Sequence, residues 1–332
     1  MPVPPLRYLS GADVRAAMPD VEQRLELART TLVALVDDAE LPPKLGVHPR
    51  EEASLSHAMP ALLRGRDATG REDLLGIKWV TGFPGNGARG IDAIHATIIL
   101  SDPMTGVPLA IMDGAPITAQ RTAAVSGVAL REWWPETAGT APRVALVGAG
   151  AQGASHVDVL AHLARGAILT IADRLGERAA RLAASAHESG CFTSVKTAVD
   201  AEEAVNEADV VLTMVSFGAL RQAVPAAAFE RAGLVVAVDY DMCVPAQVVN
   251  GARLFLVDEL GQFAATRSES VFGGYPTPDG SIGEALTGRA PAPRTHGPVV
   301  VSHLGVGLAD VVFADAILRR ATKLGLGIEL PR

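Results

Sequence analysis

Short apolar runs alternate with helical patterns through the second half of the chain. The runs predict strands at residues 143–147, 168–172, 210–215, 234–238 and 253–257, with a last strand at 299–302. Around them, apolar residues at helical spacing predict helices near residues 151–165, 176–188, 200–207 and 262–271. Strands that alternate with helices are typical of a parallel sheet with helices on both faces. The pattern therefore predicts an α/β fold with a doubly wound sheet.

Patterns in the first half of the chain are more varied. Ser10 and Asp13 have capping-box spacing, and apolar positions recur at helical intervals from Val21 to Leu35, which predicts a helix covering an apolar surface. The segment 41–71 is irregular, which is typical of short extended pieces separated by turns.

The period of the pattern changes to two at Leu74. Trp79 then lies on one face of a predicted strand, and Lys78 lies on the opposite face. Apolar runs at 94–100 and 107–112, joined by a turn that contains a proline, predict a hairpin.

Chain length and two further helices indicate two domains. At 332 residues the chain is too long for one typical core. One helix is predicted at 116–131, where small residues allow close packing, and another at 311–321 that can return to the first domain. We therefore expect one domain formed by 1–130 together with 306–332, and a second formed by 131–305.

Net charge and cysteine usage exclude several classes of protein. The formal net charge is -8, and no run of Lys and Arg offers a surface for nucleic acid. Cys191 and Cys243 form neither a disulfide framework nor zinc-ligand spacing, so we expect no metal site and a reducing, cytoplasmic setting. Residues 1–5 lack signal-peptide features, and no apolar run reaches membrane-spanning length. We expect a soluble protein with a small substrate.

A glycine motif follows the first predicted parallel strand. Gly148, Gly150 and Gly153 lie between a strand-like run and a helix-like run. The first glycine permits a tight turn, the second lets backbone N–H groups approach a pyrophosphate, and the third lets the helix pack on the strand. With Ala151 and Gln152 at the helix N-terminus, the motif predicts a dinucleotide site of the Rossmann type. The alternative, a glycine turn without a ligand, is disfavoured by the order of strand, turn, helix and acidic residue.

That acidic residue is Asp173, which ends the second predicted strand twenty residues after the last glycine. A carboxylate there binds the hydroxyl groups of the adenosine ribose and repels a 2′-phosphate, which favours NAD. Arg174 can instead accommodate a 2′-phosphate, so NADP stays an alternative. Asp173 can also cap the next helix, and that role is compatible with cofactor binding.

Residues after other strands are candidates for catalysis, because ligands lie beyond the carboxyl ends of parallel strands. Ser216 follows the run 210–215 and can line the nicotinamide ribose. Asp239 and Asp241 follow the run 234–238, where a carboxylate can pair with a substrate ammonium or act as general acid or base for an imine. Capping of the loop explains either aspartate equally well.

Lys78 and Arg121 supply positive charge from the other predicted domain. A cationic pair binds the carboxylate of an amino acid or keto acid, arginine through two hydrogen bonds and lysine as a point charge. A lone lysine on an amphipathic strand is more often a solvated side chain, and the pattern alone favours that alternative.

Several stretches together resemble the ornithine cyclodeaminase and mu-crystallin family, which includes archaeal-type alanine dehydrogenases and bacterial imine reductases. The resemblance runs from about residue 10 to the end of the chain. The matching stretches are 76–84, 100–109, 112–124, 147–152 and 302–310. It implies a homodimer in which an α+β domain, 1–130 with 306–332, binds the substrate and pairs the subunits, while a Rossmann domain, 131–305, binds NAD(P).

The resemblance also assigns residues. It implies that Lys78 and Arg121 bind the substrate carboxylate, and Lys44 is the nearest match to a further basic residue of relatives. Thr122 and Ser302, within the matching stretches, are expected near the cofactor.

Asp241 matches the aspartate that cyclodeaminases and alanine dehydrogenases place beside the substrate nitrogen. The chain departs from cyclodeaminases around it, because Tyr240 stands where they have glycine and their following lysine is missing.

We therefore expect an NAD(P)-dependent oxidoreductase that acts on the Cα–N bond of a small amino acid, through its keto acid or imine, with Lys78 and Asp241 as catalytic residues. A cyclodeaminase that releases ammonia and a mu-crystallin-like NAD(P)H-binding protein with little turnover are the alternatives.

Overall fold

The chain divides into two compact units in a computed structural model that describes residues 4–50, 54–65, 72–218 and 220–332. Unit 1 consists of residues 1–121 and 305–332, and unit 2 of residues 122–304. Helix α3 (Ala115–Trp133) carries the chain from one unit to the other. Two expectations fall partly outside the described residues. They concern the first five residues and the segment 41–71.

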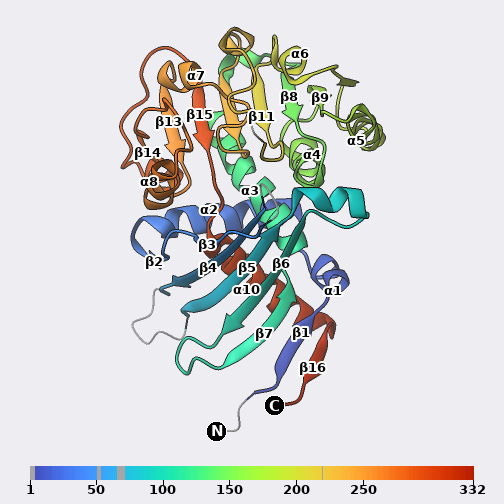
Figure 1. The fold of residues 1–332 in the computed structure, drawn as a ribbon, viewed down its shortest axis with the longest axis vertical. Coiled ribbons are helices and arrows are strands. Elements are labelled where there is room, and N and C mark those ends of the chain that lie inside the picture. The colour runs from blue at the N-terminus through green and yellow to red at the C-terminus, as the bar shows by residue number, and fades with distance from the viewer. Residues whose placement is uncertain (1–3, 51–53, 66–71, 219) are drawn as a thin grey trace. The chain divides into compact units, whose positions relative to one another are not determined.

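Unit 1 is built on one sheet of eight mostly antiparallel strands (Figure 1). The strand order is β16-β1-β7-β6-β5-β4-β2, and β3 pairs with β4. The bounds are β1 (Leu6–Leu9), β2 (Ala39–Glu40), β3 (Leu45–Val47), β4 (Leu55–Leu63), β5 (Leu74–Gly82), β6 (Ile94–Ser101), β7 (Pro108–Asp113) and β16 (Ile328–Leu330). The strands β6 and β7 form the predicted hairpin, and β1 runs parallel to β7.

Helices cover one face of this sheet. They are α1 (Gly11–Ala16), α2 (Val21–Asp37) and α10 (Gly307–Leu324), with the short helix η1 (Pro84–Arg89) between β5 and β6. In Figure 1, α10 (red) runs across the sheet, and it contacts β4, β5, β6 and α2. The capping box at Ser10 and Asp13 is confirmed. The single helix expected there is wrong, because Pro19 interrupts it and Asp20 caps a second helix.

Strand β4 was not expected, because the sequence predicted only short extended pieces between residues 41 and 71. Pro60, which cannot donate a backbone hydrogen bond, lies inside this nine-residue strand. The register explains why Pro60 is tolerated: β3 pairs with residues 56–58 and β2 with residues 62–63, so no strand needs a hydrogen bond from Pro60 on that side.

Strand β5 confirms the predicted alternation. Gly76, Lys78, Val80 and Gly82 are buried beneath the helices, whereas Trp79 on the other face is 44% exposed. The lysine therefore lies on the covered face and the tryptophan on the open one.

Unit 2 contains the predicted doubly wound sheet, with eight parallel strands in the order β10-β9-β8-β11-β12-β15-β13-β14. The bounds are β8 (Arg143–Val147), β9 (Ile168–Ala172), β10 (Ser194–Thr197), β11 (Val210–Thr213), β12 (Leu234–Ala237), β13 (Leu254–Val257), β14 (Gly280–Ser281) and β15 (Val299–Ser302). All four residues of β11 are buried, as expected for a strand with both faces covered.

The helices of unit 2 follow the strands as the sequence predicts. They are α4 (Ala151–Leu163), α5 (Gly176–Glu188), α6 (Ala201–Val205), α7 (Ala246–Asn250), α8 (Leu260–Ser268) and α9 (Ile282–Leu286), with the short helices η2 (Glu136–Ala138) and η3 (Ala226–Phe229). The sequence did not predict β10, β14, α7 or α9, each of which has at most five residues.

Candidate functional site

Three charged side chains meet in the interior of unit 1. Lys78 on β5 forms an ion pair with Asp310 on α10, with 2.6 Å between Nζ and Oδ2. Arg121 on α3 donates a hydrogen bond from Nε to Oδ1 of the same carboxylate, at 3.1 Å. Lys78 is 1% exposed, Arg121 is 5% exposed and Asp310 is 0% exposed. The solvated-lysine alternative is therefore wrong, and the structure brings Lys78 and Arg121 together through a carboxylate that the sequence analysis missed.

Glycines allow helix α10 to come close enough for these contacts. A Cβ on Gly76 would lie 2.8 Å from the backbone oxygen of Ile99 and 2.9 Å from Cγ2 of Val311 on α10. A Cβ on Gly307, the first residue of α10, would lie 2.6 Å from the backbone oxygen of Met59 on β4. Because both positions lack a side chain, Asp310 reaches Lys78.

The surroundings of Lys78 change its protonation. The pKa of Lys78 is lowered to about 7, chiefly by burial. The ion pair with Asp310 opposes this shift, whereas the charges of Arg121 and Lys44 contribute to it. Lys44, which lies between β2 and β3 and is half-buried, is thus close enough to act on Lys78. Burial also lowers the pKa of His57 on β4 to about 4, with help from Lys44. Lys78 can therefore exchange a proton near neutral pH beside an uncharged His57.

The glycine turn of unit 2 connects β8 to α4 and has the geometry of a phosphate-binding turn. Gly148 has φ +112°, and a Cβ there would lie 2.6 Å from the backbone oxygen of Met214. A Cβ on Gly153 would overlap with the backbone oxygen of Gly148. A Cβ on Gly150, by contrast, would meet nothing within 4 Å. Packing of the protein requires the first and third glycines, whereas the second borders open space, which fits the approach of a pyrophosphate.

Asp173 directly follows β9 and is tied to this turn. Its carboxylate accepts hydrogen bonds from the backbone N–H groups of Ala149 and Leu175, both at 2.8 Å. Asp173 thus orders the glycine turn and the segment before α5 together. It does not cap α5, because the N-cap of that helix is Leu175 and receives no side-chain hydrogen bond. The side chain of Arg174 is exposed.

The other expected cofactor residues occupy different environments. Ser216 is exposed after β11, and Thr122 is buried in α3. Gln152 Oε1, in the first turn of α4, and Ser302 Oγ, at the end of β15, are buried atoms with no hydrogen-bond partner among the residues that the structure describes. A buried polar atom without a partner is costly, so these two atoms fit a ligand that offers hydrogen bonds.

The two aspartates after β12 have different roles. Asp239 accepts hydrogen bonds from Thr213 Oγ1 at 2.8 Å and from the backbone N–H of Val215 at 3.1 Å, and burial raises its pKa to about 6. It joins the ends of β11 and β12, as the loop-capping alternative expects. Asp241 accepts a hydrogen bond from the backbone N–H of Phe272 at 2.9 Å and forms an ion pair with Arg221. Arg221 had no signal in the sequence.

Strained backbone surrounds Asp241. Tyr240, Gln222 and Phe272 all have positive φ, at 62°, 53° and 62°, a region that residues other than glycine rarely adopt. Gln222 donates its backbone N–H to the backbone oxygen of Asp241 at 2.8 Å. Such outliers concentrate where function fixes the position of a group.

A buried hydrogen-bond chain links the glycine turn to the segment after β15. Ser126 Oγ lies 2.8 Å from Nε2 of His156 and 2.8 Å from Nε2 of His303. His156 Nδ1 lies 2.7 Å from the backbone oxygen of Gln152, so this nitrogen carries the proton and Nε2 accepts from Ser126. Burial lowers the pKa of His156 to about 4, which keeps the ring neutral. The sequence pointed to this hydrogen-bond chain only through His303, which belongs to the matching stretch 302–310.

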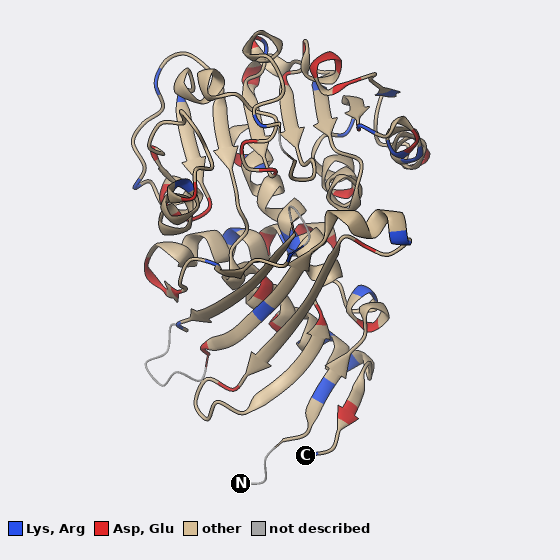
Figure 2. Ribbon diagram, viewed as in Figure 1, with Lys and Arg blue, Asp and Glu red and all other residues tan. Residues whose placement is uncertain are grey.

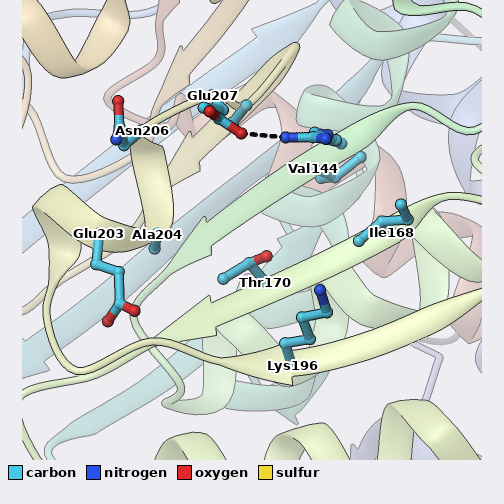
Figure 3. A pocket seen from close by; sticks show the side chains of 10 residues that line it. Val144, Ile168, Thr170, Lys196, Glu203, Ala204, Asn206 and Glu207 are labelled. Atoms are coloured by element: carbon cyan, nitrogen blue, oxygen red, sulfur yellow. Dashed lines mark hydrogen bonds and ion pairs between the residues drawn. The ribbon is translucent and has the colours of Figure 1, made fainter.

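A hollow of about 350 Å³ in unit 2 lies elsewhere (Figure 3). It is lined by residues near the start of β8 and β9, and by β10 and α6, and Arg143 forms an ion pair with Glu207 beside it. The glycine turn follows the end of β8, so this hollow is not the expected cofactor site.

Charges of both signs are interspersed over each unit, and the parallel strands of unit 2 carry few of them (Figure 2). Within the described ranges, no group of three or more His, Cys, Asp and Glu side chains is arranged to hold a metal ion. Likewise, no helix in the described part of the chain has the length and apolar character needed to cross a membrane.

Known proteins match the chain along most of its length. The model of the ornithine cyclodeaminase/mu-crystallin family matches residues 12–228. The nodulation efficiency protein NfeD of Rhizobium meliloti is 31% identical over 332 residues, which cover 98% of each chain. The Delta(1)-pyrroline-2-carboxylate reductase of Bacillus cereus is 25% identical over 328 residues, which cover 96% of this chain and 97% of that one.

A solved structure matches the fold of the whole chain. The Delta(1)-pyrroline-2-carboxylate reductase of Thermococcus litoralis, in complex with NADH and L-proline, has a TM-score of 0.82 and 21% identity, covering 98% of this chain and 100% of that one. This likeness confirms the predicted fold class. Because the family model spans more than half of the chain and a relative of equal extent is 31% identical, the chain belongs to the ornithine cyclodeaminase/mu-crystallin family.

Proposed function

We propose that the protein is an NAD(P)-dependent oxidoreductase that acts on the Cα–N bond of a small amino acid or of its imine. The observation that carries this proposal is the buried pair of cations, Lys78 and Arg121. A lysine and an arginine side by side are a binding site for a carboxylate. Membership of a family that contains dehydrogenases and imine reductases supports the reaction class.

The residues of the chain have separate tasks in this proposal. Lys78 and Arg121 bind the substrate carboxylate and so fix the orientation of Cα. NAD(H), which the turn from Gly148 to Gly153 would hold, would supply or accept the hydride at Cα. Asp241 holds the proton of the substrate nitrogen, and its contacts with Arg221 and the backbone of Phe272 fix the position of its carboxylate. Lys78, with a pKa of about 7, is a second group that can move a proton at neutral pH.

We propose NAD as the cofactor, bound at the turn from Gly148 to Gly153. The open space at Gly150 and the unpartnered Gln152 Oε1 and Ser302 Oγ support this position. Asp173, held beside the turn, favours the unphosphorylated ribose, although the exposed Arg174 follows it. Tighter binding of NADH than of NADPH, measured by cofactor fluorescence, is the expected result.

Reduction of an imine is the favoured direction, because two relatives with this fold are pyrroline-2-carboxylate reductases. A cyclodeaminase remains the second enzymatic candidate, but Tyr240 fills a position that cyclodeaminases keep as glycine. The third candidate is a binding protein that holds NAD(P)H with little turnover. Asp241 counts against it, because a protein without turnover has no need of an acid or base beside the substrate nitrogen.

We also propose a homodimer that forms through the open face of the unit 1 sheet. The register aligns Pro60, Ile77, Ile99 and Ile111 across four strands of that face, and all four side chains are half-buried. Trp79, at 44% exposure, lies on the same face. Apolar rows of this kind mark protein interfaces. Light scattering should give twice the mass of the chain, and Trp79→Glu should shift the protein towards monomer.

A substrate panel tests the proposed function. The purified protein is incubated with NADH and cyclic imino acids, or with keto acids and ammonia, while NADH fluorescence is followed. Consumption of NADH supports the reductase. Release of ammonia and proline from L-ornithine with only traces of NAD supports the cyclodeaminase, and tight NADH binding without either reaction supports the binding protein.

Lys78→Ala tests the carboxylate site. The variant loses a charge-assisted contact worth about 2–3 kcal/mol, which corresponds to a loss of roughly 30- to 160-fold in kcat/KM. Binding of NADH should be unchanged, because the glycine turn belongs to the other unit. Activity equal to that of the parent protein would rule out this role of Lys78.

A further inference from the structure

We propose that Asp310 is a positioning residue of the carboxylate site. Its side chain holds Lys78 and Arg121 next to each other and cancels one of their two positive charges, so that the site offers a single net positive charge to one substrate carboxylate. This inference rests on the proposed function for the identity of the ligand, but its first step, the control of Lys78 by Asp310, stands on contacts within unit 1.

The contacts divide the carboxylate between the two cations. Oδ2 of Asp310 faces Nζ of Lys78 at 2.6 Å, and Oδ1 accepts from Nε of Arg121 at 3.1 Å. Because each oxygen binds one cation, the planar carboxylate fixes the separation of the two side chains. On its other edge, the guanidinium of Arg121 lies against Gly305, where a Cβ would lie 2.5 Å from Nη1. Arg121 is therefore held in place from two sides.

The charges do not balance inside the protein. Protonated Lys78 and Arg121 carry two positive charges and Asp310 carries one negative charge, and these three residues are 5% exposed or less. Lys44 adds a further positive charge near Lys78. His57, whose pKa is lowered in part by the charge of Lys78, has a pKa of about 4 and is neutral. Buried charge is stable only when it is compensated. One bound carboxylate would complete the compensation of the trio.

Asp310 also determines when Lys78 is charged. Burial and the charges of Arg121 and Lys44 lower the pKa of Lys78, and the ion pair with Asp310 opposes all three effects. Without the carboxylate, Lys78 would lose its proton at lower pH and would no longer bind an anion at neutral pH.

Lysine NMR measures this effect directly, because the chain contains only four lysines, Lys44, Lys78, Lys196 and Lys323. The full-length protein is labelled with ¹³C-lysine, and the signal of Lys78 is identified by its loss in Lys78→Arg. The pKa of Lys78 is then read from the shift of its Cε signal as a function of pH, without any assay of activity.

Asp310→Asn should lower the pKa of Lys78 by about 1–3 pH units, the usual effect of one close opposite charge. Asp315→Asn is the matched control. Asp315 lies on the same helix and pairs with Arg319 at 2.8 Å, so its removal should leave the Lys78 titration unchanged. A folded Asp310→Asn variant in which Lys78 titrates as in the parent protein would overturn the proposal.

Arg121→Gln tests the same arrangement without touching Asp310. It removes a like charge while the carboxylate stays, so the pKa of Lys78 should rise. A fall, or no change, contradicts the three-charge arrangement even when Asp310→Asn does not fold.

Addition of pyruvate separates this inference from the proposed function. A bound carboxylate should raise the pKa of Lys78 in the parent protein. If pyruvate has no effect but Asp310→Asn lowers the pKa, the positioning role of Asp310 stands and the carboxylate site of the proposed function fails.

Discussion

Tyr240 has a backbone conformation that a side chain makes costly. Its φ of 62° lies in the left-handed region, where a residue with a Cβ is disfavoured by about 1–2 kcal/mol. Its ring lies 4.9 Å from that of Phe217 and 5.8 Å from that of Phe272, and these contacts offset the strain. The aromatic contacts therefore make a large side chain compatible with this left-handed position.

At position 240, glycine should give a more stable protein than alanine, which is the reverse of the usual order of stability. Both variants lose the ring contacts, but alanine retains the strain and glycine does not. We expect Tyr240→Gly to be more stable than Tyr240→Ala by about 1 kcal/mol in the free energy of unfolding, measured by denaturant titration. Phe217 is the control, because its φ is not positive. Phe217→Ala should therefore be more stable than Phe217→Gly. Greater stability of Tyr240→Ala would contradict this account.

At the scale of elements, the contact between β5 and α10 depends on Gly76. A Cβ there would collide with the backbone oxygen of Ile99 and with Val311. Gly76→Ala should therefore push α10 away and lower the free energy of unfolding by about 1–3 kcal/mol, as seen in denaturant titrations.

Gly150→Ala provides the comparison for Gly76→Ala. A Cβ on Gly150 would enter open space at a φ of -86°, so its effect on stability should stay within about 0.5 kcal/mol. The same substitution should weaken NADH binding, because the added methyl group occupies the space left for the pyrophosphate. Equal losses of stability in the two variants would contradict the roles assigned to these glycines.

Most elements were predictable because local patterns determine them. The strands of unit 2 are apolar on both faces, and the alternation around Lys78 is a property of β5 itself. Strand β4 was missed because it contains Pro60. Proline is tolerated inside this strand because β3 and β2 pair with the residues before and after Pro60 and not with Pro60 itself. The break between α1 and α2 was missed although Pro19 was visible.

The candidate site was predictable only in part, because its contacts join distant parts of the chain. The sequence predicted Lys78, Arg121 and the glycine turn from motifs and resemblance. Asp310 lies 189 residues after Arg121, and no local pattern connects them. Arg221 reaches Asp241 from a different loop. Such partners emerge only when the sheet and α10 are in place.

For the whole molecule, stability as a function of pH combines groups of opposite effect. The pKa of His156 is about 4 in the folded protein, below its usual 6.5, so its contribution to stability is present above pH 6.5 and is lost as the pH falls to 4. The pKa of Asp239 is raised from 3.8 to about 6, so its contribution is present below about pH 4 and is lost as the pH rises through 6.

Two neutral substitutions should separate these effects. His156 makes the folded parent protein less stable as the pH falls from 6 to 4, and His156→Gln removes this effect. The free energy of unfolding of the variant, relative to that of the parent protein, should therefore increase as the pH falls. Asp239→Asn should show the opposite trend. Denaturation midpoints measured across this range check both signs, and parallel curves for all three proteins would contradict the assignment.

The pairing of β1 with β16 has a consequence for biosynthesis. Residues 6–8 pair with residues 328–330, and the sheet of unit 1 is covered by α10, which begins at Gly307. A ribosome adds roughly 5–20 residues per second, so the whole of unit 2, residues 122–304, is made over about 10–40 s while the first strands still lack their cover. During that time the apolar face around Lys78 is open to chaperones and to other nascent chains, and the sheet of unit 1 can be completed only after residues 328–330 have been made.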